Sequence, residues 1–330
     1  MQSALPGQGR IDFSEMRILT YQHGLYPRSE RVVAATRGLE RGRVSREAVD
    51  DVYRQDLADL LQVQQEAELD FFSDGLLRWQ DIFRPLAAGA SLPARVLTRW
   101  FDNNAFFRAP EIDGALPRFT VPDLIIADPT VPQPRVATLP SPYMFSRAAV
   151  TAGERNDLML NLARDVLRPS AERLASSGAQ LIHLQEPWLG FFGVERADLP
   201  HIERALDAIS GGLDADVVFH VYFGDAAPYA DWLRGLPVHA VGVDLVETDA
   251  DALGSDWRIG VVAGTVDGRR SVVESDAHIA DVVSHVAEVA SPPVLYITSN
   301  SDLEFLPTEV AQRKIRALGA AARRLKEPVG

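Results

Sequence analysis

The stretch "DVVFHVYFGD", residues 216–225, decides the fold prediction for this chain. Between its two terminal aspartates almost every residue is apolar, which is typical of a strand buried on both faces of a parallel sheet. His220 and Tyr222 stand near the C-terminal end of this run. A histidine in that position either binds a ligand or is an ordinary polar group that lines a pocket.

The same pattern recurs along the chain, where short apolar runs alternate with stretches of helical period. Eight strands with intervening helices in about 315 residues indicate a (β/α)₈ barrel of the α/β class. An open doubly wound sheet should carry a glycine-rich phosphate turn after its first strand, and "YQHGLYPR" (21–28) is not one. We therefore predict a short disordered lead-in over 1–15 and one barrel domain over 16–330. The predicted strands are 16–22, 69–74, 135–141, 180–186, 216–223, 239–246, 258–266 and 294–300.

One connection, residues 76–134, is long and irregular, and in a compact domain such a connection usually serves function. Within it we predict an extra strand over "FTVPDLII" (119–126). Its aromatic residues could form a lid over a planar ligand or a packed loop core: Trp79, Trp100, Phe101, Phe106 and Phe107. Elsewhere, Thr151 with Glu154 and Ser271 with Glu274 have the capping-box spacing that predicts helix starts.

Composition excludes several classes of protein. The net charge of −13 argues against binding to nucleic acid or to an anionic membrane surface. No apolar run is long enough to span a bilayer, and the N-terminus lacks the basic and apolar regions of a signal peptide. We therefore expect a cytoplasmic location. The chain has no cysteine, which excludes disulfides, thiol nucleophiles and every zinc site built on thiolates.

Polar residues follow the predicted strands where each one ends. In a (β/α)₈ barrel the chemistry lies at this C-terminal mouth, so the acids, arginines and aromatics there suit a small polar substrate such as an amino acid. Loop acids at such a mouth can also be merely solvated. His23 lies near the mouth, whereas His183 sits inside a strand and is expected to pack.

Seven segments in order resemble the C-terminal catalytic barrel of cobalamin-independent methionine synthase and its short single-barrel relatives. The resemblance runs from about residue 20 to 325 and is strongest in the second strand's long connection. The segments are "HGLYPR" (23–28), "SDGLLRWQD" (73–81), "RWFDNNAFFRAPE" (99–111), "LQEP" (184–187), "HVY" (220–222), "VDGR" (266–269) and "SNSDLEFLP" (299–307).

The resemblance implies methyl transfer from a folate or corrinoid donor to the sulfur of homocysteine or a related small thiol, as in methionine biosynthesis. Zinc would hold that sulfur as a thiolate, because a free thiol is mostly protonated at neutral pH. His220 matches the family's histidine ligand, but its two cysteine positions are Tyr222 and Ser301. The resemblance thus implies a degenerate zinc site, with His220, Asp244 and Glu247 as the candidate ligands.

Other roles also come from the resemblance. Gln185 stands where the family has an aspartate that holds the substrate's ammonium group, and Glu186, Asp74, Arg78 and Asp267 match the family. The predicted catalytic residues are His220, Tyr222, Glu186 and Asp267. The predicted substrate-binding residues are Gly24, Tyr26, Arg28, Asp74, Arg78, Gln185, Trp188, Asn300 and Ser301.

Three functions remain open at this point. The first is a methyltransferase that acts on homocysteine or a related thiol with altered activation. The second is a metal-independent barrel enzyme of the same superfamily, a decarboxylase or lyase that works by acid–base chemistry. The third is a non-catalytic barrel that binds a small molecule.

Overall fold

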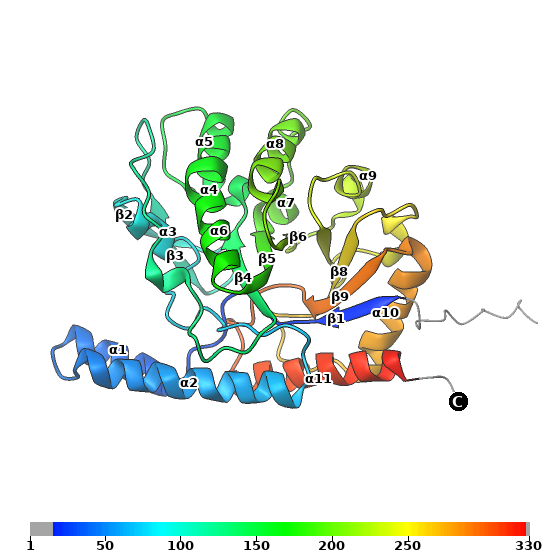
Figure 1. Ribbon diagram of the computed structural model, residues 1–330, viewed down its shortest axis with the longest axis horizontal. Helices are drawn as coiled ribbons and strands as arrows, with labels where there is room; N and C mark the ends of the chain where they lie inside the picture. The colour runs from blue at the N-terminus through cyan, green and yellow to red at the C-terminus, as the bar shows by residue number, and fades with distance from the viewer. Residues whose placement is uncertain (1–15, 328–330) are drawn as a thin grey trace, which may run out of the picture.

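A computed structural model describes residues 16–327, so the predicted lead-in over 1–15 lies outside the described residues. Seven parallel strands form one curled sheet in the order β1-β9-β8-β7-β6-β5-β4 (Figure 1). Each confirms a predicted strand to within a few residues. They are β1 (Arg17–Thr20), β4 (Arg135–Pro140), β5 (Ala179–Glu186), β6 (Asp216–Val221), β7 (Ala240–Asp244), β8 (Gly260–Val266) and β9 (Val294–Ser299).

The predicted strand over 69–74 is reduced to two bridging residues. Phe71 pairs with Tyr21 beside β1, and Phe72 pairs with Arg135 of β4, both in parallel. This segment thereby fills the gap between the two edge strands and completes the barrel. It stops at Ser73 because the side chain of Gln64, not a neighbouring strand, bonds both the N–H and the C=O of Ser73, at 2.9 Å each.

The inside of the barrel confirms eight strand positions. One apolar cluster takes a single buried or nearly buried residue from each position, the layered filling that is typical of closed (β/α)₈ barrels. The layer consists of Tyr21, Phe71, Val136, Leu181, Val218, Ala240, Val262 and Tyr296. The predicted fold class is therefore correct.

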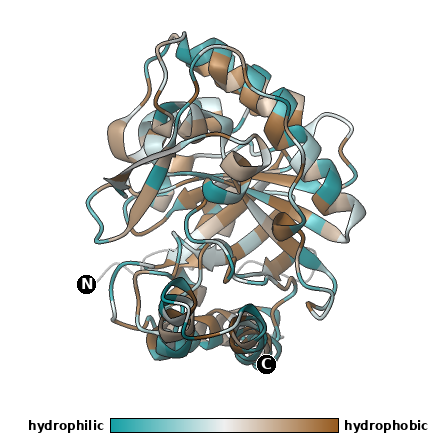
Figure 2. Cartoon of the chain, turned by 90° about the vertical axis from the view of Figure 1, so that its left-hand side faces the viewer, coloured by the Kyte–Doolittle hydropathy of each residue, from teal (hydrophilic) through white to brown (hydrophobic). Residues whose placement is uncertain are grey.

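Helices cover the outer face of the sheet (Figure 1). Below it in the view run α1 (Glu30–Glu40), α2 (Arg46–Glu66) and α11 (Thr308–Lys326), and α11 contacts both α2 and α10 (Asp276–Ala290). The other side carries α4 (Pro142–Ala148), α5 (Arg155–Leu162), α6 (Arg168–Ser176), α7 (Pro187–Phe192), α8 (Leu199–Ser210) and α9 (Ala230–Leu233). Figure 2 shows the hydrophobic strands between these helical layers.

Both predicted capping boxes are wrong. Helix α5 begins after Glu154, whose side chain makes no cap bond, and it continues through a π-helical turn, η2 (Ala163–Leu167), into α6. Helix α10 begins at Asp276 with Ser275 as its N-cap. Glu274 instead pairs with the buried Lys314 at 2.7 Å, an ion pair that a local sequence pattern could not reveal.

The long connection contains α3 (Arg84–Gly89), an antiparallel hairpin of β2 (Ala94–Arg99) and β3 (Phe106–Pro110), and a 3₁₀ turn, η1 (Asp123–Ile125). The extra strand predicted over 119–126 is therefore wrong. Pro122 lacks an N–H for a ladder, and its carbonyl accepts a turn bond from Ile125. Of the helices in the described part of the chain, none is long and apolar enough to cross a membrane.

Candidate active site at the barrel mouth

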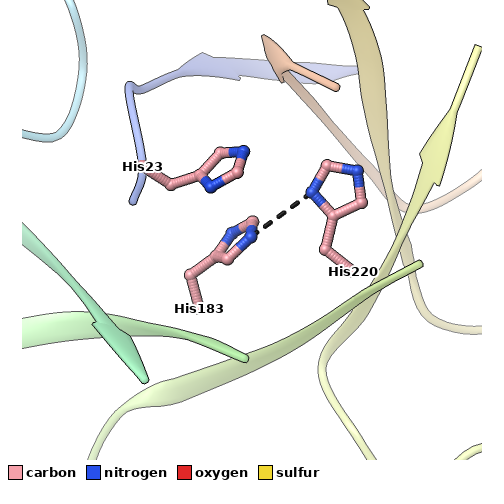
Figure 3. A group of neighbouring side chains, drawn as sticks. All are labelled: His23, His183 and His220. Atoms are coloured by element: carbon pink, nitrogen blue, oxygen red, sulfur yellow. Dashed lines mark hydrogen bonds between the residues drawn. The ribbon is translucent and has the colours of Figure 1, made fainter. Parts of the chain in front are cut away.

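Three histidines meet inside the barrel, directly above the apolar layer. His183 and His220 come from the neighbouring strands β5 and β6, and His23 follows β1 (Figure 3). Alternate residues of a strand share one face, so His183 and Gln185 both point inward, and Gln185 pairs in register with His220. All three imidazoles are fully buried. We call His23, His183 and His220 the histidine cluster.

The hydrogen bonds of His23 fix its protonation. Its Nε2 lies 3.1 Å from the carbonyl oxygen of Ser299, which only accepts, so Nε2 carries the proton. Its Nδ1 then accepts from the amide nitrogen of Gln185 at 3.3 Å. The His23 ring also stacks on His183, with centroids 3.9 Å apart and planes inclined by 14°.

A second chain of hydrogen bonds passes through the other two rings. The hydroxyl of Tyr21 lies 3.0 Å from Nδ1 of His183, and Nε2 of His183 lies 3.3 Å from Nδ1 of His220. The chain stops there, because Nε2 of His220 is buried without a hydrogen-bond partner. A buried polar atom left unsatisfied costs free energy, so such an atom at a barrel mouth points to a ligand.

Burial keeps the cluster neutral. It lowers the pKa of His23 to about 4 and holds the pKa values of His183 and His220 well below their usual range. Charge repulsion from His23 lowers the pKa values of the other two rings further. An imidazolium here would lack both water and a counter-ion, so the site works with neutral rings near pH 7.

Zinc does not fit the histidine cluster in this arrangement. An ion bound by an imidazole nitrogen lies close to the plane of that ring, and the planes of two rings inclined by only 14° do not meet within coordination distance of both. Hydrogen bonds also occupy both nitrogens of His23, both of His183 and Nδ1 of His220. Although the ligand atoms of the cluster lie within 4.8 Å of one another, only Nε2 of His220 is available.

The predicted zinc ligands other than His220 are occupied elsewhere. Asp244 accepts from the backbone N–H groups of Phe223 and Val246 and from the amide of Asn300, at 3.0–3.1 Å. Burial raises its pKa to about 6. Glu247 forms an exposed ion pair with Arg269. In the described part of the chain, His220 gathers with other potential ligands only in the histidine cluster.

A buried carboxylate lies beside the histidine cluster. Asp302 accepts from the backbone N–H of Leu25 at 2.6 Å, from the amide of Gln185 at 2.8 Å and from the hydroxyl of Tyr222 at 3.4 Å. Both amide protons of Gln185 are thereby used, while its carbonyl oxygen is buried without a partner. Gln185 thus presents an unpartnered amide oxygen and His220 an unpartnered ring nitrogen, at the same end of two adjacent strands.

Asp302 and Glu304 both lie at the mouth, where their negative charges repel each other. Burial, together with the charge of Asp302, raises the pKa of Glu304 to about 8. Burial likewise raises the pKa of Asp302. Both line a cavity of about 10 Å³, the space of roughly one water molecule. The mouth is therefore closed to a substrate in this conformation.

Aromatic side chains make that closure. Phe101, in the turn between β2 and β3, lies 5.2–5.8 Å (between ring centroids) from Trp188, Phe191, Phe192 and Phe223. The next residue, Asp102, pairs with Arg269 at 3.3 Å, and that guanidinium lies over the ring of Phe223. We call residues 101–105 the hairpin lid. Trp100 turns the other way and packs on Phe83 and Phe107, so of the predicted aromatic set Phe101 belongs to the lid and Trp100 and Phe107 belong to a loop core.

The structure brings some of the other predicted site residues to the mouth. Gly24 has φ +71°, and a side chain there would meet the carboxylate of Asp302. Ser301 donates to Asn300, whose amide oxygen also accepts from Gly268. These contacts brace the loop after β9, and they leave the predicted roles of Asn300 and Ser301 as predictions.

The remaining predicted site residues have structural roles or lie away from the mouth. Glu186 caps α7 through the N–H of Leu189 and accepts from Ser141, and burial raises its pKa to about 7. Asp267 bonds the N–H of Arg269 and pairs with Arg270. Tyr26 is buried against α2 and α11, and Arg28 is exposed. Asp74 and Arg78 line a separate pocket beside α2.

Sequence reasoning missed Tyr21 as a member of this site, expected His183 to pack, and gave Asp302 no role. The signal for His183 was present: it lies two residues before Gln185, so both must face the barrel interior. Asp302 follows the last strand at the predicted mouth, but its contacts depend on how the loop after β9 folds back onto Leu25 and Gln185.

A closed (β/α)₈ barrel with a polar cluster at its C-terminal mouth is the architecture of barrel enzymes. Comparison with known proteins identifies the family. The family model for the N-terminal domain of cobalamin-independent synthase matches residues 71–291. The chain belongs to this family, which confirms the resemblance at the level of the family. The match is to the N-terminal domain, whereas the sequence motifs pointed to the C-terminal catalytic barrel.

Relatives agree with that assignment. The methionine synthase of Methanothermobacter marburgensis is 32% identical over 175 residues, 51% of this chain and 54% of that protein. The chain therefore spans about half the length of this relative in the match. The methionine synthase of Sulfolobus acidocaldarius is 22% identical over 307 residues, 88% of this chain and 87% of that protein.

Solved structures confirm the fold. A B12-independent methionine synthase from Shewanella sp. W3-18-1, in complex with selenomethionine, has a TM-score of 0.67 at 19% identity and covers 86% of this chain and 90% of its own. A putative vitamin-B12-independent methionine synthase from Listeria monocytogenes has a TM-score of 0.70 at 16% identity, over 93% and 99%.

Proposed function

We propose that this chain is a methionine-synthase-like methyltransferase that moves a methyl group from a folate or corrinoid donor to the sulfur of homocysteine or a related small thiol. Its family and its methionine synthase relatives support the reaction. The observation that carries the proposal to this chain is the unpartnered Nε2 of His220 at the barrel mouth, next to the unpartnered amide oxygen of Gln185.

The thiol binds without a zinc–thiolate site in this proposal. The proposal assigns His220 the tautomer in which Nδ1–H donates to Nε2 of His183, so that Nε2 carries a free lone pair and accepts the S–H of the thiol. Burial lowers the pKa of His220, so the ring takes the proton only as the sulfur attacks the methyl carbon and then releases it readily. The S–H bond breaks as the S–C bond forms, and the electron pair of the donor–methyl bond stays on the donor. The nitrogen of a folate donor then takes the proton, whereas with a corrinoid donor the proton passes to solvent.

The hairpin lid must open for this reaction. The histidine cluster is fully buried, and the cavity beside Asp302 is about the size of one water. Ring contacts lead from His220 through Tyr222 and Phe223 to Phe101, so displacement of Phe101 would expose the cluster stepwise. Lids that exclude water during a reaction commonly move in this way.

The test is methyl transfer to homocysteine by the purified full chain, with methyltetrahydrofolate and methylcobalamin as alternative donors and methionine measured by mass spectrometry. The metal content is measured on the same sample. Methionine formation that persists after chelation supports the proposal. Activity that appears only with stoichiometric zinc would overturn the metal-free arrangement, and no transfer from either donor would overturn the reaction.

A second candidate is acid–base chemistry on a carboxylated substrate. The observation that favours it is the pair of the buried Asp302 and the half-buried Glu304, since two neighbouring carboxyl groups in one site can divide into an acid and a base. Consumption of a small carboxylic acid with release of carbon dioxide, and no methyl transfer, would favour this function.

A further inference from the structure

A second cavity lies on the outside of the barrel, between α2 and the segment 123–129 that descends toward β4. Its volume is about 530 Å³, within the usual range of small-molecule sites. None of its lining residues belongs to the histidine cluster or to the small cavity at the mouth. We call it the lateral pocket.

Most of the wall of the lateral pocket is apolar. Helix α2 provides Tyr53 and Leu57, the segment after the second strand provides Leu77, and the descending segment provides Leu124 and Ile126. Such a wall favours the apolar body of an organic molecule, because the hydrophobic effect scales with the apolar area that leaves water.

Acidic side chains outnumber basic ones in and around this wall. Arg78 pairs with Asp50 and covers the ring of Tyr53, while Arg54 pairs with Asp51 one turn away. Both arginines are thus neutralised by acids of α2 that do not line the pocket. An anionic ligand would have to displace these pairs.

Three carboxylates that do line the pocket have no ion pair within residues 16–327: Asp74, Asp123 and Asp128. Asp128 accepts from Thr130, and the nearby arginines reach it at longer range. Asp74 accepts from the backbone N–H of Leu76 in its turn. Burial, and to a smaller extent the charge of Asp128, raises the pKa of Asp74, although the more distant Arg135 acts in the opposite direction.

We propose that the lateral pocket binds a small organic cation, an amine with an apolar body, whose ammonium group pairs with Asp74 and whose body lies against Leu57, Leu77 and Ile126. The amine supplies the counter-ion that Asp74 lacks and fills the apolar space with one molecule. Because the cation favours the ionised carboxyl, binding lowers the pKa of Asp74 and strengthens as the pH rises through it. This site is independent of methyl transfer at the mouth.

Three probes of nearly the same shape test the proposal by calorimetry on the full chain: phenethylamine, the neutral 2-phenylethanol and the anionic 3-phenylpropionate. We expect saturable binding of the amine, at least about tenfold tighter than the alcohol, and no binding of the anion. Asp74→Asn keeps the turn bond to Leu76 and should remove the preference for the amine. Ala127→Trp should fill the space and abolish binding.

Asp214→Asn, which removes an exposed charge far along the chain on the loop before β6, is the matched control and should leave amine affinity unchanged. Equal affinity for the alcohol and the amine would overturn the proposed preference for a cation, and so would unchanged amine binding in Asp74→Asn. Absence of saturable binding of all three probes up to about 10 mM would overturn the site itself. Each variant is first checked for its unfolding midpoint.

Discussion

The histidine cluster and the lateral pocket handle ionisable groups in opposite ways. In the barrel, hydrogen bonds to neighbouring groups take up five of the six ring nitrogens, two each on His23 and His183 and one on His220, and burial keeps the rings uncharged. In the lateral pocket, Asp74 has one backbone bond and no cation. The first site is closed and has one free ring nitrogen, whereas the second is open and its carboxylates lack a counter-ion. A ligand therefore enters the mouth only after a movement of the protein, but can enter the pocket directly.

The largest expected effect is on chemistry at the mouth. His220→Ala removes the single free ring nitrogen and should lower kcat/KM for methyl transfer at least about 100-fold, as loss of a group that takes a proton usually does. His278→Ala, on the exposed face of α10, is the control. Amine binding in the lateral pocket should not change in either variant. A normal rate in His220→Ala would remove His220 from the reaction.

Gly242→Ala tests how tightly the cluster is packed. A Cβ atom at Gly242 would lie 2.4–2.7 Å from three carbon atoms of His220, so the ring must shift. We expect a loss of about 1–3 kcal/mol in the free energy of unfolding, measured with urea. Gly235→Ala, whose added Cβ meets only a carbonyl oxygen at 3.6 Å, should change it little. Equal stability of the two variants would mean that the cluster is loose.

The pH dependence of stability should follow the buried carboxyls. The folded pKa values, about 7 for Glu186 and about 8 for Glu304, lie above their ordinary value of 4.5, so between the unfolded and the folded pKa of each group the folded state binds more protons. Above pH 6.5 stability should therefore keep falling to about pH 8, by up to about 1.4 kcal/mol per pH unit for each group still protonated in the folded state, and then level off. The low pKa of His23 acts in the opposite direction, but only between about 4 and 6.5.

Glu304→Gln should flatten this decline, because the amide does not titrate. The measurement is the urea midpoint of both proteins across the same pH range. A decline of equal slope in the variant would show that Glu304 is ionised without penalty in the folded chain.

The smallest expected effect concerns the hairpin lid. Asp102→Asn removes a partly exposed ion pair with Arg269, and such pairs contribute at most about 1 kcal/mol. The population with an open lid should rise by no more than about fivefold, seen as stronger acrylamide quenching of the fluorescence of Trp188. Asp113→Asn, an exposed acid in the same long connection, should have no effect. Identical quenching in both variants would argue that Phe101 alone holds the lid.

Local patterns predicted the barrel well because each buried parallel strand is apolar along its whole length and ends in polar residues. They failed where a distant side chain replaced a local partner. Gln64 ends the second strand at Ser73, and Lys314 draws Glu274 away from the predicted helix cap. The prediction correctly placed polar groups at the ends of the strands that form the mouth. It could not say which of those groups hydrogen-bond to one another.

The sequence by itself determined the α/β barrel, the family and the absence of a thiolate zinc site, since strand period, motif order and cysteine content are properties of the chain alone. Only the tertiary structure decided that His23 stacks on His183, that Asp302 joins Leu25 to Gln185, and that Asp74 faces a pocket outside the barrel. These contacts join residues far apart in the chain. Their geometry depends on strand register and loop path, which no local pattern of residues records.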